Sequence, residues 1–159
     1  MKTLISLIFG GCLLTAVMTL PALAGTRPIE TLKDLHATAL DAADHADELS
    51  AMTRAYGASG ESYARQLEEL KEDINDMVKP LHTLATGDLP SAAQKISLVR
   101  AAALLNELAT NTQSAMVYVQ ERRGPFWQPE YQKYVATLVA RTEELAEALG
   151  RAVQAAARQ

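Results

Sequence analysis

The chain has 159 residues, of which 48% are hydrophobic and 21% are charged, and its formal net charge at pH 7 is −4. This length suits one domain with a buried core of its own. The acidic balance argues against a nucleic-acid partner, because binding to phosphates needs a basic face. With only one cysteine, the chain cannot form an internal disulfide.

The first 24 residues have the pattern of a secretory signal peptide. Lys2 gives the basic start, residues 4–20 are almost wholly apolar, and Ala22-Leu23-Ala24 is an Ala-x-Ala cleavage site. We therefore expect cleavage before Gly25 and a periplasmic or secreted protein with no membrane contact afterwards. The alternative is a retained anchor, since the apolar run is about long enough to span a bilayer.

The only cysteine, Cys12, lies inside the predicted signal peptide and would leave with it. The exported protein would then have no disulfide, no cysteine-ligated metal and no haem attached through a Cys-x-x-Cys-His motif. Its stability would have to come from a packed core. Loss of Lys2 would also take the net charge from −4 to about −5.

Residues 25–159 contain four runs in which apolar or small residues are spaced alternately by three and four. That spacing places the members of each run on one stripe of a helix. The runs are Leu32, Leu35, Ala39, Ala42, Ala46, Leu49, Met52 and Tyr56; Tyr63, Leu67, Leu70, Ile74, Met77, Leu81 and Leu84; Leu98, Ala101, Leu105, Leu108, Thr112, Ala115 and Val119; and Tyr131, Val135, Leu138, Thr142, Leu145, Leu149, Ala152 and Ala156. We predict helices over about 29–56, 60–85, 90–122 and 129–157.

Short breaks separate the four runs. Gly57 suits a helix C-cap, Ser59 an N-cap and Pro129 a first helical position, while 86–91 carries stop and start signals together. Short loops between long helices imply antiparallel neighbours, so the sequence predicts an all-α, up-down-up-down four-helix bundle as the single domain, residues 25–159. Further apolar residues surround the third run, and we expect its helix to be the most buried.

The aromatic residues that follow the predicted signal gather around two of the three breaks. In an up-down-up-down bundle the first and third loops lie at the same end. We call the group at that end the aromatic pole. Its members are Tyr56, Tyr63, Tyr118, Phe126, Trp127, Tyr131 and Tyr134. Arg122 and Arg123 lie just before two of these rings in the sequence.

Two interpretations of the aromatic pole are open. Large rings can close the flared end of a bundle whose middle is packed with alanine, with arginine stems lying over them. Tyrosine, tryptophan and arginine also dominate binding hot spots, and arginine suits a carboxylate or phosphate ligand. The pole is therefore the best candidate in the chain for a site that binds a partner or ligand. That site would comprise Tyr56, Tyr63, Arg122, Arg123, Phe126, Trp127, Tyr131 and Tyr134.

Two histidines form an alternative site. His36 and His82 would fall at about the same level if the first two helices pair antiparallel, and a facing pair inside a bundle could hold a metal ion or a b-type haem. The competing interpretation places both on partly exposed flanks. One side of the first helix also carries Asp41, Asp44, His45 and Glu48. We interpret this side as a solvated acidic face with a contact between Asp41 and His45, and the alternative is weak binding of a divalent cation.

No spacing in the chain matches a known catalytic motif. It lacks a nucleophile elbow, a catalytic cysteine, a His-Glu-x-x-His zinc site and a phosphate-binding loop. We expect an exported, soluble, non-enzymatic bundle without a cofactor that binds a protein partner as an inhibitor, immunity factor, accessory factor or adaptor. The alanine-rich stripe of the first helix is also compatible with a homodimer. The alternative function is binding of a small molecule, a metal or b-type haem, as in a sensor or carrier domain.

Overall fold

The computed structural model of the protein describes residues 26–55, 58–87, 91–121, 126 and 128–158. Within these ranges lie four helices: α1 (Thr26–Arg54), α2 (Gly60–Thr86), α3 (Ala92–Glu121) and α4 (Pro129–Ala157). The predicted ranges 60–85 and 129–157 differ from α2 and α4 by at most one residue. The predicted signal peptide, residues 1–24, lies outside the described residues.

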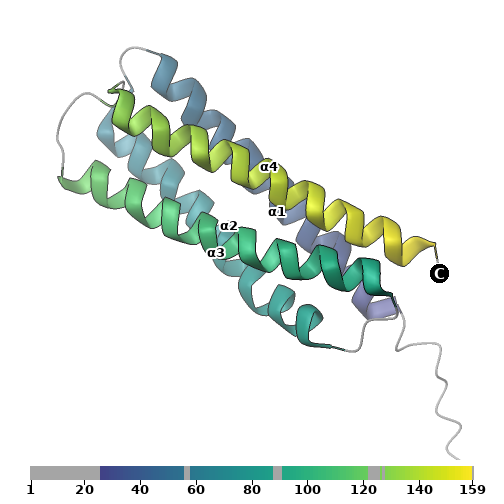
Figure 1. Ribbon diagram of the computed structural model, residues 1–159. Coiled ribbons are helices and arrows are strands. Elements are labelled where there is room, and N and C mark those ends of the chain that lie inside the picture. Colours follow the sequence, from purple (N-terminus) through teal and green to yellow (C-terminus); the bar gives the residue numbers. More distant parts are fainter. Residues whose placement is uncertain (1–25, 56–57, 88–90, 122–125, 127, 159) are drawn as a thin grey trace, which may run out of the picture.

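The four helices run antiparallel to their neighbours (Figure 1). Each packs against the helices before and after it in the chain, and α4 returns to pack against α1. This closed order is that of an up-down-up-down bundle, and the predicted all-α four-helix fold is confirmed. The end of α1, the start of α2, the end of α3 and the start of α4 lie together at one end of the bundle.

Local capping groups explain where two of the helices begin. The backbone N–H of Ser62 donates to the side-chain oxygen of Ser59 at 3.1 Å, so Ser59 is the predicted N-cap of α2. In the same way the N–H of Gln94 donates to Ser91 Oγ at 3.2 Å just before α3. Pro129 is the first residue of α4, where its missing N–H costs no hydrogen bond. Gly57 lies outside the described residues.

The core consists of the predicted stripes. Apart from Met52, which is partly buried, and Tyr56, which lies outside the described residues, every member of the four runs is buried. Ala39, Ala42 and Ala46 of the α1 stripe are completely buried, which brings the neighbouring helix backbones close together in the middle of the bundle.

The outer side of α3 corrects one expectation. Ile96 and Val99 are 70% and 56% exposed, and Val117 is also exposed, so α3 is not covered around its circumference. A helix in a four-helix bundle has only two neighbours, which bury one stripe and leave the opposite one in solvent. Apolar residues on that opposite stripe stay exposed, whatever the hydrophobicity of the helix as a whole.

None of the described helices contains a stretch that is long and apolar enough to cross a membrane.

Candidate functional site

Four rings of the predicted aromatic pole pack against one another at the end of the bundle. The centroid of Tyr131 lies 5.3 Å from that of Tyr63, 5.6 Å from that of Phe126 and 5.5 Å from that of Tyr118. Tyr63 and Phe126 are closer still, at 4.7 Å. These distances and the edge-to-face contacts of Tyr131 are those of favourable aromatic pairs. Because α2, α3 and α4 each contribute a ring, the cluster ties three helices together.

The loop that follows α3 also joins this cluster. A Cβ atom on Gly60, the first residue of α2, would lie 3.2 Å from two ring atoms of Phe126, so glycine allows the ring to approach the α2 backbone closely. The hydroxyl of Tyr118 donates to the side-chain oxygen of Gln128, which is the N-cap residue of α4, at 3.1 Å. The first residue of α2 and the residue before α4 therefore both contact the same group of rings.

The buried hydroxyls differ in their partners. Tyr63 donates to the backbone oxygen of Met52 at 2.7 Å. The Tyr131 hydroxyl is buried and makes no hydrogen bond with the described residues. Burial raises the pKa of both tyrosines above the usual value of 10.0, and the proximity of Tyr63 raises that of Tyr131 further. Both rings are therefore neutral at physiological pH.

The predicted site residues fall into three groups. Tyr63, Phe126 and Tyr131 are buried, so they serve as packing at the end of the bundle and offer little surface to a partner. Tyr134 is partly exposed and lies 6.0 Å from Tyr118, centroid to centroid. The remaining predicted residues, Tyr56, Arg122, Arg123 and Trp127, lie outside the described residues. Binding at the pole stays a prediction that depends on that last group.

The two histidines of the alternative site lie on different surfaces. His36 lines a groove between α1 and α4, whereas His82 is exposed on α2. A Cβ on Gly150 would lie 3.2 Å from the Nε2 atom of His36, so the imidazole ring rests on the backbone of α4. Among the described residues, no group of three or more histidine, cysteine and acidic side chains is placed to hold a metal ion.

The third histidine bridges two helices. The Nδ1 atom of His45 on α1 lies 2.7 Å from Oδ2 of Asp73 on α2, and its Nε2 lies 4.0 Å from Glu69. Desolvation raises the pKa of Asp73. The contact with His45 lowers this pKa in part, whereas the nearby charge of Asp41 raises it further. His45 therefore contacts Asp73 across the α1–α2 seam, and not Asp41 on its own helix as predicted. The spacing of residues within one helix does not show which residues of another helix face it.

The sequence interpretation missed an exposed apolar surface on α3, which we call the α3 face. It is a shallow hollow of about 420 Å³ lined by Lys95, Ile96, Val99, Arg100 and Ala103. Ile96, Val99 and Ala103 follow each other by three and four residues on the outer side of the helix. That second periodic stripe, offset from the core stripe, was the signal in the sequence that could have identified it.

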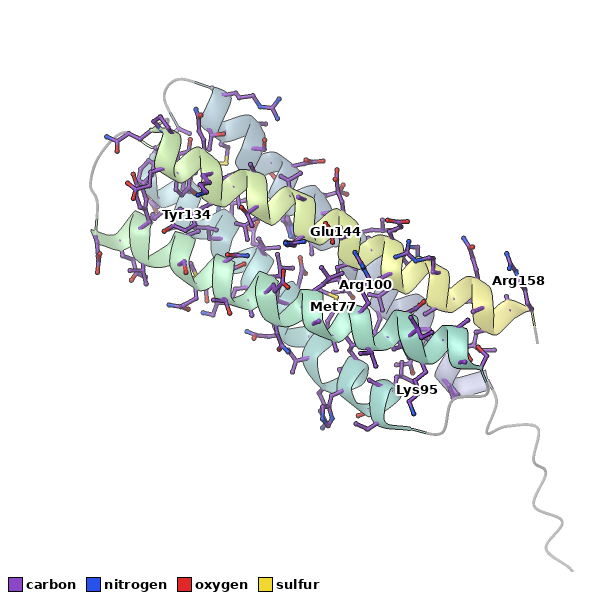
Figure 2. All side chains as sticks on the ribbon, in the orientation of Figure 1. Met77, Lys95, Arg100, Tyr134, Glu144 and Arg158 are labelled. Carbon is purple, nitrogen blue, oxygen red and sulfur yellow. The ribbon has the colours of Figure 1, made fainter. Side chains whose placement is uncertain are left out.

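Ion pairs hold one side of the α3 face in place. Arg100 Nη2 lies 3.2 Å from Oε2 of Glu144 on α4. Both side chains are labelled in Figure 2. Arg141 of α4 contacts the same Glu144 at 3.1 Å and Glu107 of α3 at 3.0 Å. The resulting chain of charges crosses the α3–α4 seam. Arg100 and Glu107 are more than half exposed and Arg141 and Glu144 about a third, so the chain of charges orients Arg100 more than it stabilises the fold.

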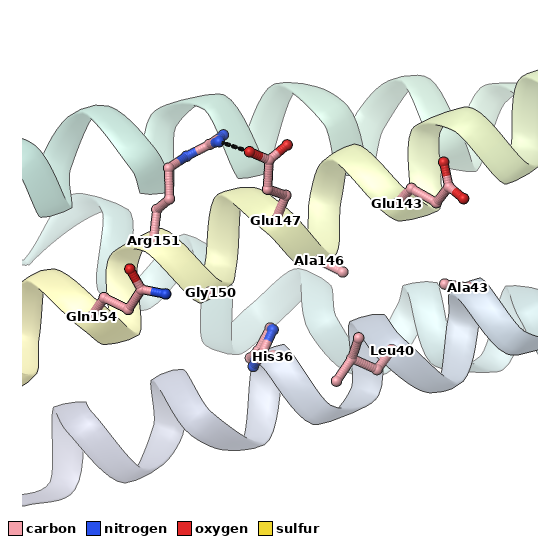
Figure 3. A pocket seen from close by; sticks show the side chains of 9 residues that line it. All are labelled: His36, Leu40, Ala43, Glu143, Ala146, Glu147, Gly150, Arg151 and Gln154. Carbon is pink, nitrogen blue, oxygen red and sulfur yellow. Dashed lines mark hydrogen bonds and ion pairs between the residues drawn. The ribbon is translucent and has the colours of Figure 1, made fainter.

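A second unpredicted surface is the groove between α1 and α4 (Figure 3), which we call the α1–α4 groove. Its volume is about 610 Å³. It is lined by His36, Leu40, Ala43, Glu143, Ala146, Glu147, Gly150, Arg151 and Gln154. Leu40, which is 48% exposed, lines it together with the small residues Ala43 and Ala146. The charged members lie on α4, where Arg151 is paired with Glu147.

Comparison with protein-family models, with characterised proteins and with solved structures found no match to this chain. The function has to be inferred from the surfaces described above.

Proposed function

We propose that this protein is an exported, non-enzymatic helical bundle that binds a protein partner through the α3 face. The observation that carries this proposal is the exposure of Ile96 and Val99, at 70% and 56%, on one side of a helix whose opposite side already packs the core. Grouped apolar residues on a surface are typical of interaction sites. The roles that fit are those of an inhibitor, an immunity factor, an accessory factor or an adaptor.

The chemistry of the α3 face indicates the kind of surface that it would bind. Removing its apolar area from water contributes about 25 cal/mol for each Å² that a partner covers. Lys95 and Arg100 flank the apolar residues, whereas the chain as a whole is acidic. The fitting partner therefore offers an apolar stripe with acidic residues beside it, such as one face of an amphipathic helix. Like charges would disfavour two α3 faces binding each other.

Binding at the α3 face leaves a structural role for the described rings of the aromatic pole. Tyr63, Phe126 and Tyr131 lie inside the bundle end, and a partner would have to unpack them to reach them. Ile96 and Val99 need no rearrangement to be covered. The contact proposed here thus uses side chains that already stand in solvent.

The test is co-purification from the cells that make the protein. We expect a discrete protein to be retained by the wild type and lost with Val99→Glu, because a carboxylate would be desolvated in an apolar contact. Gln113→Glu is the matched control, since it adds the same charge at an exposed position of the same helix. Retention of the same protein by all three versions would contradict a contact at the α3 face.

A further inference from the structure

Side chains join α2 to α1 at two levels of their shared seam. At the aromatic end, the Tyr63 hydroxyl donates to the backbone oxygen of Met52 at 2.7 Å. Further along, Nδ1 of His45 lies 2.7 Å from Oδ2 of Asp73, and its Nε2 lies 4.0 Å from Oε2 of Glu69. The side chains of His45 and Asp73 are 30% and 20% exposed. The imidazole ring therefore stands between two carboxylates of α2 and is only partly in water.

The charged side chains along this seam are almost all acidic. Residues that follow one another by three, four or seven lie on one side of a helix. On the sides that carry His45 and its partners, these residues are Asp34, Asp41, Glu48, Arg65, Glu69, Glu72, Asp73 and Asp76. Arg65 is exposed and makes no ion pair within the described residues, where lysine and arginine pair with other glutamates. The charged residues of the α1–α4 groove lie on another seam of α1.

The folded seam favours an added positive charge. Burial raises the pKa of Asp73, and the charges of Asp41 and Asp76 raise it further, whereas the contact with His45 lowers it. Because the net direction is upward, an ionised Asp73 remains unfavourable in this seam even beside the imidazole ring. A charged His45 faces Asp73 and Glu69 at once and reduces the repulsion among these carboxylates. The unfolded chain keeps them apart in water and has less to gain from the same charge.

Among the four helices, α2 is the one on which such a contact has the greatest effect. Both α1 and α3 pack more closely on α4 than on α2. Pro80 lies inside α2 and has no N–H to donate to the carbonyl oxygen of Asp76. Segments with fewer packing contacts open at a lower free energy than the rest of a protein. Separation of α2 from α1 is therefore favoured over separation of α1 from α4.

We propose that His45 is a pH-dependent contact that holds α2 to α1. In mild acid the imidazolium donates from Nδ1 to Asp73 and directs its second N–H toward Glu69. At alkaline pH the neutral ring can still donate from Nδ1 to Asp73, but its Nε2 lone pair then faces Glu69. The seam also keeps its full negative charge. The α2 helix then opens from the rest of the bundle more readily.

The direction of the pH effect follows from proton binding. The folded seam binds a proton more tightly than the unfolded chain, so the free energy of unfolding rises as the pH falls. This contribution is complete where histidine is charged and is lost as the pH rises through about 5 to 8, the range in which histidine loses its charge. In stronger acid, protonation of Asp73 ends the ion pair.

Urea unfolding of the whole protein at about pH 5.5 and at about pH 8 tests the proposal. The ratio of the two folding equilibrium constants should be about fivefold larger for the wild type than for His45→Gln, the size expected of a charged hydrogen bond at a partly exposed position. His82→Gln is the matched control, because it removes an exposed histidine of α2 and should keep the wild-type ratio. The same ratio in the wild type and His45→Gln would overturn the proposal.

Native-state hydrogen exchange tests whether the effect belongs to α2. After correction for the intrinsic pH dependence of exchange, amides of α2 should lose protection between the two pH values, whereas those of α4 should lose less. Asp73→Asn removes the charge that faces the imidazolium and should reduce this difference. Equal losses in α2 and α4 would contradict a separate opening of α2. The seam is not part of the α3 face, so failure of this proposal leaves the partner contact untouched.

Discussion

At the scale of single residues, the Tyr131 hydroxyl stands out. The ring is fully buried and packs against three other aromatic rings, which accounts for its position. The hydroxyl makes no hydrogen bond with the described residues. A buried polar group without a partner costs about 1 to 3 kcal/mol. Nothing in the described structure explains the oxygen, and Gln66 Nε2 and Thr112 Oγ1 are buried without a hydrogen bond in the same way.

Tyr131→Phe should therefore be as stable as the wild type at neutral pH or more stable by up to about 1 kcal/mol. The pH dependence should change as well. Because the pKa of Tyr131 is raised in the folded protein, the unfolded chain loses this proton first, and the stability falls as the pH rises above the ordinary value of 10.0. The variant lacks this loss. Urea unfolding across the alkaline range measures both effects.

Tyr63→Phe is the control for that experiment. It removes a hydroxyl that donates to the backbone of Met52 and should destabilise the bundle by about 1 kcal/mol at neutral pH. The opposite order, with Tyr131→Phe the more damaging substitution, would show that the Tyr131 hydroxyl has a stabilising partner.

At the scale of helices, the sequence was sufficient for the elements and their buried stripes. The spacing of Leu32, Leu35 and Ala39 and of their counterparts on the other helices placed the core, and Ser59 and Pro129 marked two helix starts. These features depend only on neighbours within one helix, which is why they could be predicted.

Contacts between helices could not be predicted in the same way. His45 has acidic neighbours on its own helix, yet its hydrogen bond goes to Asp73 on α2. The exposure of Ile96 and Val99 also depends on the number of helices that pack around α3. The buried half of the aromatic pole was placed at the correct end of the bundle. Its hydrogen bonds and stacking partners required the structure.

The N-cap of α2 provides a test at this scale. Ser59→Ala should destabilise the bundle by about 1 kcal/mol, because the N–H of Ser62 loses its acceptor at the helix start. Ser59→Asp should restore most of the loss, since a carboxylate accepts the same bond and its charge suits a helix N-terminus. Thermal unfolding followed by circular dichroism measures both. Equal stability of Ser59→Ala and the wild type would contradict the capping role.

At the scale of the whole molecule, the surfaces and the polar contact described above lie on separate sides of the bundle. The α1–α4 groove is on one seam, the α3 face is on the outer side of the third helix, and the contact between His45 and Asp73 is on the α1–α2 seam.

The central claim, that the bundle binds a partner through the α3 face, is most directly tested by site-specific photocrosslinking in the cells that make the protein. A crosslinking side chain is placed at Val99 or, as a control, at Gln113 on the same helix. We predict that Val99 yields one adduct with a different protein and that Gln113 yields none. The same pattern from both positions, or no adduct from Val99, would contradict the account.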